Sequence, residues 1–330
     1  MKLATIRDGT RDGALVILSS DGRRYLAADA ISETLQNALD HWAMARPALE
    51  RVARELDADA TLGVSTAGVV FDAPLPRAYE WVDGSAYLNH IVLVRKARGA
   101  ELPATLETEP LVYQGGSSAF LGCRDEWVLP DVGWGLDYEA EVAVVLTDTP
   151  RGTTRERALE HVALIVLLND WSYRHLIPDE LGKGFGFFQS KPTSAFGPVA
   201  VTPDELGPAW RDGRAHLTMR SWVNGVLMGD PETGREMHFS FADLIAHITK
   251  TRAFGAGTIL GSGTVANTDP VRGASCLVER RMREIIERGN VSTPFLKIGD
   301  VVAIELVDGH GNAPCGRIEQ RVVAPGRGSS

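Results

Sequence analysis

The sequence contains few of the features that mark a secreted, membrane-bound or nucleic-acid-binding protein. Only three of its 330 residues are cysteines, and their odd number and wide spacing argue against a disulfide framework or a zinc knuckle. The longest apolar run, Val162 to Leu168, is far shorter than the roughly 20 residues of a membrane-spanning helix. Acidic side chains outnumber basic ones by 43 to 34, the wrong sign for a general nucleic-acid binder. We therefore expect a cytoplasmic protein with no export signal and with no membrane or nucleic-acid partner.

The short motifs of nucleotide-binding proteins and serine hydrolases are also missing. The glycine-rich segment 182–192 lacks the order G-x-x-x-x-G-K-[ST], and no G-x-G-x-x-G follows a predicted strand. No G-x-S-x-G sequence is present, so a nucleophilic serine of that type has no support. The glycine-rich segment better suits a loop that brings a lysine to an anionic substrate.

The length of 330 residues allows one large domain or two domains. Near the start, β-rich runs at Lys2–Arg7 and Ala14–Ser19 are separated by turn residues, which predicts a hairpin. A helical pattern follows over Ala30–Leu56, and we expect Pro47 to be the first residue of a second helix within it. A proline-containing loop then ends a small β-rich N-terminal domain, which we place at residues 1–80.

Residues 81–330 make up the second predicted domain, in which short β runs recur between glycine, proline and aspartate residues. Two helices are predicted among them, one with a capping box at Thr153 and Glu156 and one with Ser240 and Asp243. Many strands and few helices indicate a mostly β fold of the α+β class. The predicted strands are Glu141–Leu146, Ala163–Leu168, Val199–Val201, Leu217–Val223, Thr258–Gly261, Val301–Leu306 and Arg317–Val322.

Two glutamates at the start of an apolar strand form the strongest chemical signal. Glu139 and Glu141 are two residues apart, so on a strand both carboxylates project to the same side. Like charges at that distance repel each other unless a cation lies between them, and Mg²⁺ or Ca²⁺ prefers such oxygen ligands. The pair therefore predicts a metal site, although a solvated strand face would show the same alternation.

Three further residues extend this hypothesis. Asp170 follows the apolar strand 163–168 and could be another carboxylate of the site, with Arg174 as a partner. An aspartate that begins a turn would look the same. Asp83 could supply a further oxygen ligand, and His90 could act as a general base because histidine titrates near neutral pH. A purely structural role is the simpler interpretation of His90.

Taken together, these motifs resemble the fumarylacetoacetate hydrolase family. The resemblance covers roughly residues 81–323. It implies a small β-rich N-terminal domain followed by a mixed β-roll catalytic domain. The segments that carry it are the strand start Asp137-Tyr138-Glu139-Ala140-Glu141, the run Asn169-Asp170-Trp171-Ser172, the glycine-containing run Ile259–Thr264 and the run Ile298–Val302.

The resemblance implies a role for each matching residue. The metal, Mg²⁺ or Ca²⁺ with Mn²⁺ as a further option, would be held by Asp83, Glu139, Glu141 and Asp170. Lys191, 21 residues after Asp170, fits the family spacing better than Lys183, which is 13 residues after it. The implied catalytic residues are His90, Lys191, Glu279 and Arg98. The implied substrate-binding residues are Tyr87, Arg98, Tyr113, Arg174 and Thr264.

The implied activity is hydrolysis of a carbon–carbon bond in a β-diketo acid, with fumarylacetoacetate as the expected substrate and a homodimer as the expected assembly. An acylpyruvate hydrolase, an oxaloacetate decarboxylase and a 2-oxo-pentenoate hydratase are alternatives on the same scaffold. A metal-binding protein without catalysis is a further alternative. A base such as His90 favours a hydrolase over these, because water must be activated.

Overall fold

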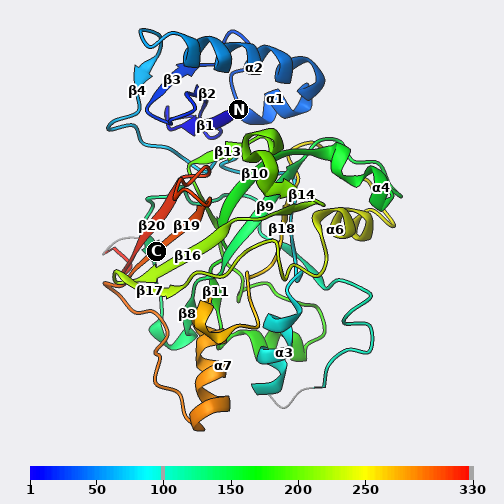
Figure 1. The fold of residues 1–330 in the computed structure, drawn as a ribbon. Helices are drawn as coiled ribbons and strands as arrows, with labels where there is room; N and C mark the ends of the chain where they lie inside the picture. The colour runs from blue at the N-terminus through cyan, green and yellow to red at the C-terminus, as the bar shows by residue number, and fades with distance from the viewer. Residues whose placement is uncertain (98–100, 327–330) are drawn as a thin grey trace.

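The computed structural model describes residues 1–97 and 101–326, in which the strands form two large sheets and two short ribbons (Figure 1). The larger sheet contains 11 strands in the order β4-β3-β2-β1-β13-β10-β9-β18-β5-β6, with β12 paired to β10. The second sheet contains five strands in the order β17-β16-β19-β20-β7. This mixed α/β architecture, an N-terminal unit followed by a larger unit rich in strands, is the predicted fold class.

The N-terminal unit is an antiparallel meander covered by two helices. Its elements are β1 (Lys2–Ile6), β2 (Ala14–Leu18), β3 (Arg24–Ala27), α1 (Leu35–Asp40), α2 (Trp42–Ala58) and β4 (Val64–Ser65). The predicted hairpin is confirmed, because β1 pairs antiparallel with β2. The first strand also pairs antiparallel with β13 (Val199–Val201), so the sheet of this unit continues into the rest of the molecule. The boundary near residue 80 stays a prediction.

The predicted break at Pro47 is wrong. The two helices are separated at His41, and Pro47 lies inside α2. Pro47 is the sixth residue of α2, beyond the first turn, so it lacks the N–H that would donate to the carbonyl of Ala43, and the packing of the helix has to offset this loss. The buried residues of α2 recur every three or four positions, which holds this helix against the sheet: Ala45, Leu49, Ala53 and Leu56.

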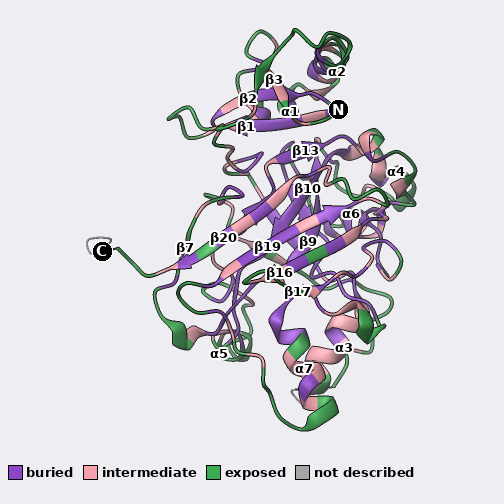
Figure 2. Cartoon of the chain, turned by 60° about the vertical axis from the view of Figure 1, so that its left-hand side comes forward, coloured by how far each residue is buried: buried purple, intermediate pink, exposed green. Residues whose placement is uncertain are grey.

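The centre of the larger sheet consists of strands that are buried on both faces. The remaining strands of this sheet are β5 (Trp81–Gly84), β6 (Val112–Gly115), β9 (Ala140–Leu146), β10 (Val162–Asn169), β12 (Ala195–Phe196) and β18 (Ile259–Gly261). Successive residues of β10 enter opposite core clusters, Ile165 and Leu167 on one face and Leu164 and Val166 on the other. Figure 2 shows this buried interior against the exposed outer side of α2. A strand enclosed in this way is a rigid support for polar groups at its end.

The second sheet packs against one of these faces. Its strands are β7 (Trp127–Val128), β16 (Thr218–Val223), β17 (Val226–Gly229), β19 (Val301–Val307) and β20 (Arg317–Val323). The short ribbons pair β8 (Leu136–Asp137) with β11 (Ser172–Tyr173) and β14 (Trp210–Arg211) with β15 (Arg214–Ala215). All seven strands predicted after residue 81 are present, with bounds shifted by one or two residues at most.

The helices of this part are more numerous than the two predicted. They are α3 (Leu88–Ala97), α4 (Arg155–Ala158), α5 (Ile177–Gly182), α6 (Phe241–Ile248) and α7 (Leu277–Arg288). The capping box of Ser240 and Asp243 is confirmed, whereas α4 is one turn long and begins after Thr154 rather than Thr153. The sequence hides α7 because its buried face includes Glu279 and Glu284, so the apolar period is broken.

Within the described part of the chain, we find no helix whose length and apolar character would let it cross a membrane.

Candidate active site

Three acids from separate strands of the larger sheet meet at one point. Asp83 lies on β5, Glu141 lies on β9, and Asp170 directly follows β10. Oxygen atoms of the three carboxylates lie within 4.8 Å of one another, and all three residues are buried. The sequence predicted this meeting from the Glu139–Glu141 pair and the strand-end position of Asp170.

A glycine on the intervening strand makes room for Asp83. Strand β18 lies between β9 and β5, with Gly261 in register with both Asp83 and Ala143. A Cβ atom at Gly261 would lie 2.3 Å from Asp83 Oδ1, so any side chain there would displace the carboxylate. The backbone N–H of Gly263 donates to the same oxygen at 3.0 Å. The first contact explains the glycine at position 261, and at position 263, where φ is +77°, a Cβ atom would lie 2.4 Å from the carbonyl oxygen of Gly84.

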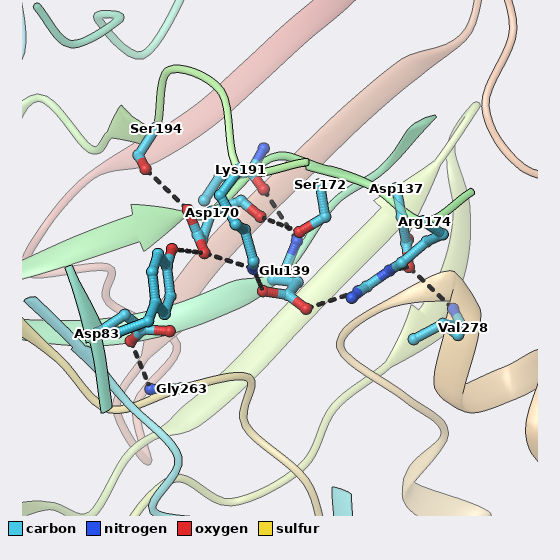
Figure 3. Close-up of polar contacts among 12 residues, drawn as sticks. Asp83, Asp137, Glu139, Asp170, Ser172, Arg174, Lys191, Ser194, Gly263 and Val278 are labelled. Atoms are coloured by element: carbon cyan, nitrogen blue, oxygen red, sulfur yellow. Dashed lines mark hydrogen bonds and ion pairs between the residues drawn. The ribbon is translucent and has the colours of Figure 1, made fainter. Parts of the chain in front are cut away.

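Glu139 is surrounded by cations from this chain (Figure 3). Its Oε1 lies 2.6 Å from Nη2 of Arg174, and its Oε2 accepts a hydrogen bond from Nζ of Lys191. Burial alone would raise the pKa of Glu139, but Arg174 and Lys191 hold it below its usual range. Glu139 is therefore a charged carboxylate with both oxygens engaged.

Glu141, two residues later, has no such partner. Both of its oxygens are buried, and neither receives a hydrogen bond from a donor that the structure describes. Burial, followed by the nearby charges of Asp83 and Asp170, raises the pKa of Glu141 well above its ordinary value. The pKa of Asp83 is raised for the same reasons, burial first and Asp170 second. Unlike Glu139, these two carboxylates form no ion pair with a cation in the part of the chain that the structure describes.

The charge balance fits a divalent cation. Among the described residues, five buried carboxylates, those of Asp83, Asp137, Glu139, Glu141 and Asp170, share the site with the buried cations Arg174 and Lys191. Three negative charges are unbalanced when all five acids are ionised. Oxygen donors of this kind suit a hard cation such as Mg²⁺, Ca²⁺ or Mn²⁺. Asp83, Glu141 and Asp170 are the residues placed to hold it, with Glu139 beside them.

Asp170 is fixed by three donors. It accepts hydrogen bonds from Tyr113 Oη at 2.6 Å, Lys191 Nζ at 2.6 Å and Ser194 Oγ at 2.8 Å. Burial alone would lower the pKa of Lys191, but Asp170 and Glu139 raise it, so the ammonium group remains charged. Ser194 was not predicted as a site residue, because a lone serine in a loop carries no sequence signal.

The loop before Lys191 is held by Glu180 at the end of α5. Its carboxylate accepts the backbone N–H groups of Phe188 at 3.0 Å, Gln189 at 2.6 Å and Ser190 at 3.1 Å. Burial alone would raise the pKa of Glu180, but these donors lower it to about 2. The anchored loop brings Lys191 into the site, whereas Lys183 lies exposed after α5.

A histidine–glutamate pair adjoins the carboxylates. His90 lies on α3 and Glu279 in the first turn of α7, and His90 Nδ1 is 3.4 Å from Glu279 Oε2. The other oxygen of Glu279 accepts a hydrogen bond from Arg283 at 2.7 Å, one helical turn later. The structure thus brings together two predicted residues that are 189 positions apart in the chain. The Nδ1 contact with Glu279 leaves Nε2 as the nitrogen free to accept a proton.

Asp137 is a residue of the site that the sequence analysis did not assign. It accepts the backbone N–H groups of Leu277 and Val278 at 2.7 and 2.9 Å, at the start of α7. Its Oδ2 also accepts from Arg174 Nε at 2.8 Å (Figure 3). A carboxylate at a helix N-terminus satisfies unpaired N–H groups and the helix dipole. The available signal was its position two residues before Glu139, although in the structure Asp137 ends β8 and Glu139 lies between β8 and β9.

The remaining predicted residues have different surroundings. Tyr87 is buried, and its hydroxyl donates to the backbone carbonyl of Thr233 at 2.6 Å. Arg174 holds Asp137 and Glu139, the contacts described above. Thr264 has a buried hydroxyl with no partner among the described residues, so it is available to a ligand. Arg98 lies outside the described residues.

Comparison with known protein families matches almost the whole chain. The family model of the fumarylacetoacetate hydrolase C-terminal region matches residues 80–323, and that of fumarylacetoacetase N-terminal domain 2 matches residues 1–77. Every residue of the site described above lies in the first of these stretches.

Individual relatives cover less of the chain. The 2,4-didehydro-3-deoxy-L-rhamnonate hydrolase of Sphingomonas sp. (strain SKA58) is 32% identical over 192 residues, which are 57% of this chain and 64% of that protein. This match therefore spans slightly less than two thirds of that relative. The human mitochondrial oxaloacetate tautomerase FAHD2A is 26% identical over 248 residues, 74% of each chain.

Solved structures share the fold over nearly the full length. Maleylpyruvate hydrolase from Sphingobium sp. SYK-6, crystallised with manganese(II) and pyruvate, superposes with a TM-score of 0.66. It is 19% identical, and the match covers 99% of this chain and 100% of that one. At this identity the likeness concerns the fold.

Proposed function

The chain belongs to the fumarylacetoacetate hydrolase family, and we propose that it hydrolyses a carbon–carbon bond in a β-diketo acid with the help of a divalent metal. The observation that carries this proposal is the group of three buried carboxylates, two of which, Asp83 and Glu141, form no ion pair with a cation among the described residues, next to the His90–Glu279 pair. Two relatives of the same fold or family are named as hydrolases, which supports the reaction type. Fumarylacetoacetate is the first substrate to test, with acylpyruvates beside it.

Asp83, Glu141 and Asp170 would hold the metal, with Glu139 beside them. When bound, a divalent cation would act as a Lewis acid toward the two oxygens of a 1,3-dicarbonyl group. The relative crystallised with manganese(II) supports a divalent metal of this kind. The residues of this chain supply the proton transfers and the remaining charge.

His90 is the proposed general base. Its Nε2 accepts a proton from water while Glu279, fixed by Arg283, holds Nδ1 and stabilises the imidazolium that forms. The hydroxide formed in this way adds to one carbonyl carbon, and the bond to the adjacent carbon breaks. The proton on His90 then passes to that carbon, so one diketo acid and one water give a carboxylic acid and a keto acid.

Lys191 supplies positive charge for the oxyanion. Its ammonium group is buried and remains charged because Asp170 and Glu139 raise its pKa. A fixed cation in a buried site stabilises developing negative charge more than one in water would. This use of Lys191 is consistent with its bonds to Glu139 and Asp170, which hold Nζ in place before substrate binds.

A second candidate is a reaction that needs no water, such as tautomerisation or decarboxylation of oxaloacetate. The human relative named as an oxaloacetate tautomerase favours including it. The two candidates differ in their products, because only the hydrolase yields two acids or an acid and a ketone from one diketo acid.

The test is a diketo-acid assay with the purified full chain. Fumarylacetoacetate, acylpyruvates and oxaloacetate would be incubated with Mg²⁺, Mn²⁺ or EDTA, and products identified by NMR. We expect metal-dependent cleavage of a diketo acid and no cleavage after chelation. Turnover of oxaloacetate alone, or full activity in EDTA, would contradict the proposal.

A further inference from the structure

A pocket beside Lys191 bears on which β-diketo acid the protein accepts. Its volume is about 580 Å³, within the range of roughly 300–1,000 Å³ that small-molecule sites occupy. Lys191 lines the pocket and also contacts the carboxylates of Glu139 and Asp170, so the pocket adjoins the reacting centre. The lining residues are Gln114, Gly115, Gly116, Ser118, Ala119, Phe187, Phe188, Lys191, Pro192 and Thr193.

The pocket offers almost no positive charge. Lys191 is the one charged residue in its described lining, and its ammonium group already contacts Glu139 and Asp170. A terminal carboxylate that packed against the two phenylalanines of this lining would lose part of its hydration without gaining a cation partner there. Loss of hydration by an unpaired charge is unfavourable.

Apolar surface is abundant at the same place. Phe188 lines the pocket with 84% of its surface exposed, and Phe187 packs edge-to-face against Tyr113 with ring centroids 5.2 Å apart. Phe185, on the same loop, is 99% exposed but does not line the pocket. A large apolar side chain left open at a pocket gains free energy when an apolar ligand covers it.

The neighbouring pocket does not supply the missing charge. It shares Ser118 with the first pocket and contains Arg11 and Arg77. It also contains Asp12 and Asp40, and Arg77 is already paired with Asp12 through contacts of 2.7 and 2.8 Å. A carboxylate that extended from the Lys191 pocket into this region would lie near negatively charged as well as positively charged side chains.

We propose that the pocket beside Lys191 receives the acyl part of the substrate and selects acyl groups that are apolar and carry no carboxylate. The inference rests on the proposed function and names its substrate class: β-diketo acids with a single carboxylate and an alkyl or aryl acyl group. Fumarylacetoacetate, whose fumaryl part carries a second carboxylate, is then a poor substrate.

A matched pair of substrates tests the proposal. Butanoylpyruvate and succinylpyruvate have acyl chains of four carbons and differ by the terminal carboxylate. We expect kcat/KM for butanoylpyruvate to be at least about tenfold higher, and to rise by up to about fourfold for each added CH₂ that the pocket buries. Equal rates or a preference for succinylpyruvate would overturn this inference alone. Cleavage of fumarylacetoacetate but of neither acylpyruvate would also overturn this inference alone, whereas cleavage of none of the three compounds would overturn the proposed function as well.

Two pairs of variants separate the pocket from the rest of the loop. Phe188→Ala should raise KM for hexanoylpyruvate about threefold to tenfold and leave acetylpyruvate nearly unchanged, whereas Phe185→Ala should alter neither. Ala119→Arg should raise kcat/KM for succinylpyruvate relative to butanoylpyruvate, and Ala119→Gln, similar in length but uncharged, should not. If Phe188→Ala and Phe185→Ala behave alike, or if Ala119→Arg leaves the ratio unchanged, the acyl group binds elsewhere.

Discussion

Glu139 and Glu141 project from the same strand start, yet the two sides of the site obtain their positive charge differently. On the Glu139 side, Arg174 and Lys191 neutralise the carboxylate from within the chain. On the Glu141 side, Asp83, Glu141 and Asp170 converge, and Glu141 has no donor among the described residues. The comparison teaches that the Glu139 carboxylate is neutralised within the folded chain, while the Glu141 side carries negative charge that a bound cation would balance.

The sharpest test of this comparison replaces a carboxylate on the Glu141 side. Glu141→Gln should weaken metal binding and lower turnover by roughly 10³-fold or more, because the Lewis acid would be lost. Calorimetric titration with Mn²⁺ beside the diketo-acid assay measures both quantities. Glu156→Gln, at an exposed carboxylate of α4, is the control. A Glu141→Gln protein that bound Mn²⁺ with unchanged affinity would break the comparison.

His90 tests whether the base is separate from the metal-binding side. His90→Ala should keep Mn²⁺ affinity nearly unchanged and lower the rate by roughly 10²–10⁴, the range for losing a general base. Asp83→Ala should instead weaken Mn²⁺ binding, because it removes a metal ligand. Loss of metal by His90→Ala with retention by Asp83→Ala would reverse our assignment of this segment.

A substitution at Asp137 tests how Arg174, which neutralises Glu139, is held in place. Asp137→Asn removes the charge that Arg174 and the start of α7 share, so Arg174 and Glu279 should lose their positions. We expect a loss of kcat of about 10–100-fold with the fold intact, the usual effect of residues that orient a metal site. Asp131→Asn, at the cap of a short helix elsewhere, is the matched control. Equal effects of the two substitutions on kcat would show that Asp137 has no special role.

The smallest expected effect concerns stability. Asp83 and Glu141 have a raised pKa in the metal-free folded chain, so between their unfolded and folded pKa values the folded chain binds more protons than the unfolded chain. The free energy of unfolding should therefore fall as pH rises from about 4 through that window. A metal at 100 times its Kd should restore about 2.7 kcal/mol at neutral pH.

Urea denaturation of the chelated and Mn²⁺-loaded chains over pH 4–8 measures this dependence. The loaded chain should gain stability over the chelated chain as pH rises, because the metal binds the ionised carboxylates. Parallel pH profiles for the two samples would contradict the unbalanced charge that we assign to the Glu141 side.

Parts of this site could be predicted from the sequence because they depend on local spacing. The two-residue period of a strand placed Glu139 and Glu141 on one side, and the apolar run before Asp170 placed it at a strand end. The family resemblance supplied His90 and Glu279, which the structure places 3.4 Å apart. Most predicted strands were also found, since continuous apolar runs bounded by turn residues are a strong signal.

Other parts depend on contacts that spacing cannot show. Glu139 and Glu141 differ because the loop held by Glu180 brings Lys191 to one of them. The role of Asp137 depends on Leu277, 140 residues away in the chain. The helix that begins there was missed because it buries Glu279 and Glu284 rather than an apolar stripe. The prediction at Pro47 was wrong because the buried face of α2 holds the helix together in spite of the hydrogen bond that the proline removes.

The pairing of β1 with β13 has a consequence for any attempt to study the catalytic part alone. Lys2, Leu3 and Ala4 lie opposite Val201, Ala200 and Val199, so the N-terminal unit covers what would otherwise be a free strand edge. Removing residues 1–80 would leave the N–H and C=O groups of Val199–Val201 without these partners, within a flat and apolar stretch of chain. Exposed edges of this kind recruit strands from other molecules. The N-terminal unit therefore covers this strand edge, and we expect a chain without residues 1–80 to be prone to aggregate.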